Sequence, residues 1–193
     1  MSVMTLPAVT EELRVSLSMR LAALEKLWDL ATRDLTLAHV NHFERPGVLP
    51  MAFTLIHAIA GQDRNRATLF GGPVLWDAWS TRVGFTGPHH GRGTPMAVAE
   101  RIRIGDLDAW CAYQATVFNA TRAAVAKASV ERLSERFPMK PESFAGGYLA
   151  LLVGEVERVR VIDVVEAWIY QHGIRHAGEL EHARALVGLR GVA

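Results

Sequence analysis

Apolar residues recur at steps of three and four along four long stretches of the chain, which places them on one face of an α-helix. This pattern predicts helices over residues 10–39, 50–70, 106–129 and 163–187. The third stretch is also rich in alanine, which favours helix and lets a neighbouring helix approach closely. Each apolar face needs a partner, so we expect the four helices to pack against one another.

The residues at the ends of these stretches support the boundaries. Thr10, Asp163 and either Asp106 or Asp108 are typical N-cap residues, because a short side chain with an oxygen atom can accept a free backbone N–H. Gly188 follows the last stretch, where glycine commonly ends a helix. The pattern and the caps therefore indicate the same four helices.

The connections are less regular than the helices. Residues 71–96 contain several glycines and prolines and are expected to form an irregular crossover, with a short helical piece at 74–82. Residues 98–104 also fit a helix. The stretch 130–144 is expected to be a polar connection, whereas 148–161 fits short β-strands and helix equally well.

Four long helices without a convincing set of strands predict an all-α protein, an antiparallel four-helix bundle formed as one domain over residues 1–193. Half of the residues are hydrophobic and 21% are charged, as in an ordinary soluble protein. The formal charge of +1 gives no reason to expect a nucleic-acid or membrane partner. One cysteine, Cys111, excludes an internal disulfide, and no signal sequence or membrane-length apolar run is visible, so we expect a soluble cytoplasmic protein.

Three histidines carry the candidate chemistry. His172 and His176 are four residues apart on the fourth predicted helix, which stacks their rings on one face and can present two imidazoles to one divalent metal. His57 lies on the apolar side of the second helix and can supply a third ligand from a facing element. Each histidine alone has an ordinary explanation as a hydrogen-bonded core residue, but three that converge favour metal binding.

The other histidines fit a shared site less well. Two lie at a helix end, two lie in the long connection, and one is rotated by about 240° from the pair on its own helix. They are His39 and His42, His89 and His90, and His182. We therefore leave them out of the predicted metal site.

Two segments together resemble the DinB/YfiT-like superfamily. They are Leu-Ile-His57-Ala-Ile-Ala-Gly-Gln-Asp and His172-Gly-Ile-Arg-His176-Ala-Gly-Glu-Leu. The family pattern is one histidine on the second helix and H-x-x-x-H-x-G-[EQ] on the last core helix, and the segment 108–113 fits the family's third helix. The resemblance covers most of residues 10–188 and is specific for the fold and the histidine triad, but not for the reaction.

The resemblance implies a four-helix bundle, often a homodimer, that holds a divalent metal such as zinc or nickel on His57, His172 and His176. Relatives include S-transferases and isomerases that use low-molecular-weight thiols. Three neutral histidines leave a fourth position on the metal for water or a thiolate, which would become the nucleophile near neutral pH. We therefore expect a metal-dependent enzyme acting on a small-molecule substrate, by thiol transfer or by hydrolysis.

Five further residues are weaker candidates around this site. Tyr113 and Trp168 would line the pocket, although aromatic residues at helical spacing are more often core. Arg64 or Arg175 would meet a substrate carboxylate. Glu179 would either form a surface ion pair with Arg175 or orient a metal-binding histidine without binding the metal itself.

Two alternatives to an enzyme stay open. One is a non-catalytic bundle in which the metal is structural or captures a small ligand, and the other is a structural dimer whose histidines are satisfied core residues. Gly173 and Gly178 bear on the same region, because a glycine inside a helix is often explained by the close approach of a neighbouring helix or a ligand.

Overall fold

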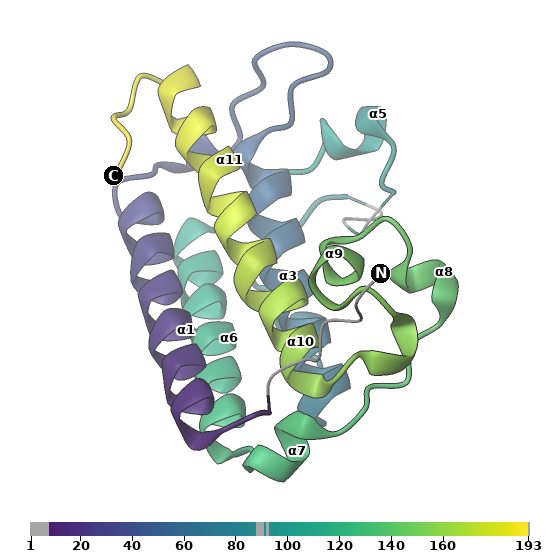
Figure 1. Ribbon diagram of the computed structural model, residues 1–193. Coiled ribbons are helices and arrows are strands. Elements are labelled where there is room, and N and C mark those ends of the chain that lie inside the picture. Colours follow the sequence, from purple (N-terminus) through teal and green to yellow (C-terminus); the bar gives the residue numbers. More distant parts are fainter. Residues whose placement is uncertain (1–7, 88–90, 92, 193) are drawn as a thin grey trace.

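The computed structural model describes residues 8–87, 91 and 93–192. Four long helices pack together (Figure 1), and the all-α prediction is confirmed. They are α1 (Glu11–Thr32), α3 (Met51–Phe70), α6 (Leu107–Lys127) and α11 (His172–Leu186). In the described part of the chain, extended pairing is limited to two isolated β-bridges.

The first predicted helix was too long. The helix α1 ends at Thr32, and a short helix, α2 (Leu37–Val40), follows after a break. Thr36 is extended and starts α2 as its N-cap, accepting the backbone N–H of His39, while the His39 ring accepts the N–H of Thr36. The apolar spacing continues across the break, which is why the pattern did not reveal it.

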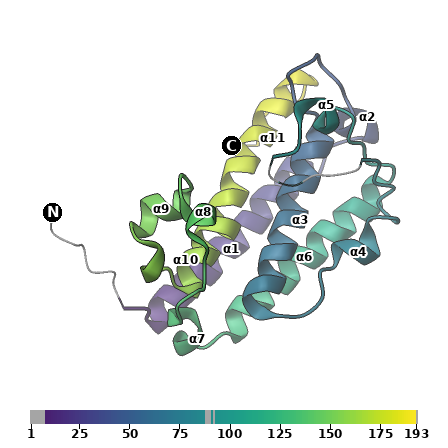
Figure 2. The same cartoon turned by 90° about the vertical axis from the view of Figure 1, so that its right-hand side faces the viewer.

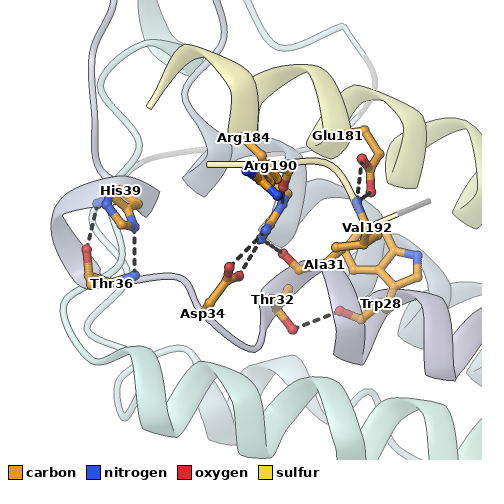
Figure 3. Close-up of polar contacts among 10 residues, drawn as sticks. All are labelled: Trp28, Ala31, Thr32, Asp34, Thr36, His39, Glu181, Arg184, Arg190 and Val192. Atoms are coloured by element: carbon orange, nitrogen blue, oxygen red, sulfur yellow. Dashed lines mark hydrogen bonds and ion pairs between the residues drawn. The ribbon is translucent and has the colours of Figure 1, made fainter. Parts of the chain in front are cut away.

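A buried arginine fastens this break to the last helix (Figure 3). The guanidinium of Arg184 donates to both carboxylate oxygens of Asp34, at 2.6 and 3.0 Å, and to the carbonyl of Ala31. It also donates to the carbonyl of Arg190 beyond the end of α11. The end of α1 and the C-terminal segment are therefore held by one side chain that is 3% exposed.

The second helix forms as predicted, and α3 begins directly after Pro50. The connection that follows contains α4 (Trp76–Trp79), within the expected helical piece, and α5 (Met96–Ala99). The helix expected over residues 98–104 is wrong, because Arg103 pairs with Thr86 through two backbone hydrogen bonds and is therefore extended.

A buried ion pair anchors this connection to α3. Asp63 is fully buried and bonds to Arg66 at 3.0 Å. The same carboxylate accepts the backbone N–H of Trp76, and Arg66 donates to the carbonyls of Gly71 and Pro73. The connection has an irregular backbone, but two side chains of α3 hold its first residues, 71–76, against that helix.

The segment between α6 and the last helices is mostly helical. It contains α7 (Val130–Ser134), α8 (Pro141–Phe144), α9 (Tyr148–Val153) and the 3₁₀ turn η1 (Val156–Arg158). Figure 2 shows α7, α8 and α9 gathered near α10, away from α4 and α5. Apolar residues of these helices pack with those of α10 (Val161–Val165) in a second core cluster. The segment 148–161, which fitted strand and helix equally well, is mainly helical.

The fourth predicted helix is interrupted inside. It begins as α10 (Val161–Val165), passes through a π-helical stretch, η2 (Glu166–Gln171), and continues as α11. The expected N-cap, Asp163, lies inside α10 instead, where its carboxylate accepts the backbone N–H of Arg160. The helix stops before Gly188, whose φ of 79° suits glycine.

Within the described ranges, none of the helices combines the length and the apolarity needed to cross a bilayer.

Candidate metal centre

Three histidines from two helices meet at one point. His57 projects from α3, and His172 and His176 project from the first two turns of α11. One ring nitrogen of each lies within 4.8 Å of the others, so the three can hold a metal ion. Their ring centroids are 4.4 to 5.4 Å apart. The residues that the sequence pattern singled out are thus brought together.

His176 is the most firmly held of the three. It is 7% exposed, and its Nδ1 lies 2.7 Å from the Glu179 carboxylate. This hydrogen bond lowers the pKa of Glu179. The carboxylate accepts it from the Nδ1–H, so the lone pair of the His176 ring is on Nε2, which lies against His172. Of the two roles expected for Glu179, the contact with His176 is the one found.

His57 is held by stacking on its own helix. Its ring is nearly parallel to that of Phe53, with 5.3 Å between the centroids and 10° between the planes. One turn later, a Cβ on Gly61 would lie 3.5 Å from Cε1 of His172. A small residue at this position therefore lets the His172 ring lie close to α3.

His172 is strongly biased toward its neutral form. Burial, then the neighbouring His176 and His57, and then Arg175 and Arg64 lower its pKa to about 3. Its Nε2 lies 3.1 Å from Nε2 of His176. A metal ligand must offer a lone pair, so a histidine that stays neutral at neutral pH is suited to the task.

The π-helical stretch sets the position of the histidine pair. A π-turn adds one residue to a helix and leaves backbone carbonyls to find other donors. Asn65 on α3 donates to the carbonyl of Trp168 at 3.0 Å, and the Trp28 indole on α1 donates to the carbonyl of Gly173 at 3.2 Å. Side chains of two other helices thus hold the segment on either side of His172.

The two glycines of this helix differ. At Gly173 a Cβ would lie 2.7 Å from the Leu24 side chain, so the close approach of a neighbouring helix explains this glycine. At Gly178 a Cβ would have no neighbour within 4 Å, and no close approach is found there.

The aromatic candidates make core contacts. Tyr113 is fully buried, packs against Trp76 and Trp79, and lies 3.4 Å from the Asp63 carboxylate. Burial and the charge of Asp63 raise the pKa of its hydroxyl. The ring of Trp168 packs edge-on against Phe137. The described contacts of both side chains are therefore those of core residues.

The remaining histidines have other surroundings. His39 caps α2, and His42 bonds to Glu44 at 3.1 Å. His182 is exposed, and His89 and His90 lie outside the described residues. The metal-binding cluster among the described residues contains none of these three placed histidines.

Sequence reasoning missed Trp28 and Asn65 as supports of the site. Asn65 follows directly after Arg64 on a helix that was predicted well, but its partner is a carbonyl freed by the π-turn. A π-turn has no pattern of apolar spacing of its own, so that partner could not be expected. Trp28 lies at the apolar spacing of its helix and is fully buried, which hid the role of its N–H.

Comparison with known proteins supports the fold. No protein-family model matches the chain, and no curated protein matches its sequence. Its structure is similar to the crystal structure of a conserved protein from Enterococcus faecalis, with a TM-score of 0.71 over 90% of this chain and 95% of that one. The two sequences are 15% identical, so the likeness extends to the fold alone. The chain shares an all-helical fold with that conserved protein, and its own residues form a three-histidine cluster.

Proposed function

We propose that this protein is a metal-dependent enzyme of the DinB/YfiT-like superfamily, an antiparallel four-helix bundle that acts on a small-molecule substrate. His57, His172 and His176 would hold a divalent ion, zinc or nickel. The observation that carries the proposal is the convergence of three imidazole nitrogens within 4.8 Å, on residues that match the family pattern. Tyr113 and Trp168 are given no catalytic role.

The residues present fit such an ion. Imidazole nitrogen suits zinc and nickel, and bundle cores commonly build metal sites from facing helices. The 3.1 Å between Nε2 of His172 and Nε2 of His176 is close to the separation of about 3.3 Å between two nitrogen ligands of a tetrahedral zinc ion. Glu179 supplies the outer carboxylate that orients a metal-binding histidine.

When bound, an ion with three histidine ligands has an open position and lowers the pKa of a water or thiol placed there. The chain's own residues provide the setting for that chemistry. Glu179 keeps the proton of His176 on Nδ1, and burial keeps His172 neutral. Phe53 holds the His57 ring by stacking. The two helices thus present three ring nitrogens to one point.

The direct test is the metal content of protein purified without a histidine tag. Wild-type protein is expected to contain close to one zinc or nickel per chain by inductively coupled plasma mass spectrometry. His57→Ala and His176→Ala are expected to lose it, whereas His182→Ala, an exposed histidine on the same helix as the pair, is expected to keep it. Metal content that is the same in all four proteins would remove the proposal.

A second experiment separates an enzyme from a metal-binding protein without catalysis. Metal-loaded protein is incubated with low-molecular-weight thiols and electrophilic acceptors, and in parallel with ester and amide substrates. Thiol consumption or hydrolysis that is lost in His57→Ala supports the enzyme. Full metal occupancy without turnover in either screen would favour the non-catalytic alternative.

The homodimer is also part of this proposal. Light scattering is expected to give twice the chain mass of 21.2 kDa. A mass of one chain at micromolar concentration would remove the dimer without affecting the metal site.

A further inference from the structure

The helix α1 carries two stripes of residues with the same spacing on opposite sides. The inner stripe is buried and recurs at alternating steps of four and three, as the contact positions of packed helices do. It consists of Leu17, Leu21, Leu24, Trp28 and Ala31. The outer stripe alternates in the same way and consists of Glu12, Val15, Met19, Ala22 and Lys26. Because 3.6 residues make one turn, the centres of the two stripes lie about 180° apart around the helix.

The middle of the outer stripe is apolar and open. Val15 is 45% exposed, and Met19 is 69% exposed. An open hollow of about 430 Å³ lies on this side of the helix, and the described residues that line it include Val15, Ser16 and Met19. Figure 1 shows α1 at the outside of the bundle, where it packs against α6 and α11. A surface helix normally turns polar residues outward, so an apolar row in this place indicates contact with another chain.

The charged residues of α1 divide into two groups. Those on the flanks of the outer stripe are paired within the chain, as Arg14–Glu11, Arg20–Glu166 and Arg122–Glu25. Glu12 and Lys26, at the two ends of the stripe, are exposed, and neither forms an ion pair among the residues that the structure describes. They lie seven residues on either side of Met19 and carry opposite charges. The stripe therefore has an acidic end, an apolar middle and a basic end.

We propose that the outer stripe of α1 is the interface with a second copy of this chain, in which the two α1 helices cross antiparallel near Met19. A two-fold interface brings the same surface of both copies together, so it must be complementary to itself. The antiparallel arrangement brings Glu12 of each copy toward the partner's Lys26 and the apolar middles together. A parallel arrangement would bring like charges together at both ends, which opposes association. The inference rests on the homodimer of the proposed function and gives that dimer its surface and direction.

The apolar middle is tested by a charge at its centre. Met19→Glu would place two carboxylates together where the helices cross, so light scattering is expected to give the mass of one chain, whereas wild type gives twice 21.2 kDa. Met96→Glu changes an exposed methionine on α5 and is the matched control, which is expected to stay dimeric. Thermal melts followed by circular dichroism would show that both variants are folded.

The charged ends test the direction of packing, and they do so even if Met19→Glu fails to fold. Glu12→Lys and Lys26→Glu each turn two attractive pairs of the dimer into repulsive ones. Each is expected to raise the dissociation constant of the dimer about tenfold, as measured by sedimentation equilibrium at low salt. The double variant Glu12→Lys/Lys26→Glu brings opposite charges together again and is expected to restore the wild-type constant.

A folded Met19→Glu that stays dimeric would overturn the inference, as would a dissociation constant that neither charge reversal changes. A dimer that is lost in Ile174→Glu instead would place the interface on α11, where Ile174 is exposed. A monomeric wild type would remove both the homodimer and this surface.

The metal site and the interface fail separately. Met19→Glu is expected to bind as much zinc as wild type, because Met19 lies on the outward side of α1 and the three histidines project from α3 and α11. A protein that takes up no zinc but shows the expected loss and rescue of the dimer would remove the metal site and leave the inference. A zinc-binding protein whose dimer ignores these substitutions would do the reverse.

Discussion

Glu179 shows how one side chain outside the histidine cluster can position a residue within it. Its carboxylate fixes the ring of His176, which is the most buried histidine of the cluster. Sequence spacing allowed either this contact or an ion pair with Arg175, because both partners lie about one helical turn from Glu179. The spacing does not show that His176 is buried while Arg175 is exposed, and the contact found is the one with the buried partner.

The role of Glu179 gives the first prediction. Glu179→Gln removes the charged acceptor, so the His176 ring is held less firmly and zinc affinity is expected to fall about 10- to 100-fold. Competition with a chromophoric chelator would measure this. Glu181→Gln, on the same helix but bonded to the C-terminal segment, is the control and is expected to keep wild-type affinity. Equal losses in both variants would contradict a specific role for Glu179.

His172 gives the metal-free protein a pH-dependent stability. Its pKa falls from an ordinary 6.5 to about 3 on folding, so between these values the unfolded chain binds more protons than the folded one. Stability is therefore lost as the pH falls through 6.5, and the loss levels off near pH 3. Between pH 7.5 and 5 the loss from this group is about 2 kcal/mol.

Urea unfolding of chelator-treated protein at pH 7.5 and 5 would measure this loss. His172→Gln is expected to reduce the difference between the two pH values by about 2 kcal/mol. His182→Gln, which changes an exposed histidine, is expected to leave the difference as in wild type. If the His172 variant kept the full difference, another group would be responsible.

At the scale of helices, α10, η2 and α11 form one interrupted element. The apolar pattern predicted this element and both of its ends to within a few residues. It did not predict the π-turn, because a single added residue changes the phase of the spacing without breaking it. The pattern also missed the break between α1 and α2. Capping by Thr36 and the bond between Asp34 and Arg184 support this break, and neither contact changes the apolar spacing.

The two glycines of α11 make a matched pair for testing its packing. Gly173→Ala would press a methyl group against Leu24 on α1, and is expected to destabilise the protein by about 1 to 3 kcal/mol. Gly178→Ala meets no neighbour and is expected to stabilise it by about 0.5 to 1 kcal/mol, because alanine favours helix. Chemical denaturation of both variants would check the opposite signs. Destabilisation by Gly178→Ala, or none by Gly173→Ala, would contradict the explanation of that glycine by the space around it.

At the scale of the whole molecule, the histidines connect helices that are far apart in the chain. His57 and His172 come from α3 and α11, so their meeting depends on the packing of the bundle. The sequence could predict the convergence only through the apolar face that each histidine shares. It could not predict which side chains support the site, because Asn65, Trp28 and Glu179 act through contacts set by packing.

Metal binding is expected to stabilise the entire fold for this reason. An ion held by α3 and α11 binds the folded state and not the unfolded one, so it adds about 4 kcal/mol at a free concentration a thousand times its Kd. Thermal melts with and without zinc would show a higher Tm in the wild type. His57→Ala, which leaves ligands on α11 alone, is expected to show little or no shift. A shift of wild-type size in that variant would place the ion elsewhere.

The π-turn also limits how this chain can vary in length. Removing one residue from 166–171 would restore a regular helix and rotate everything before it by roughly 100° relative to His172. Val164 and Val165, which are fully buried in the second core cluster, would then turn away from it. Homologous chains should therefore keep the number of residues between Asp163 and His172 even where the residues themselves differ. An insertion or deletion there would identify a chain that has lost this arrangement.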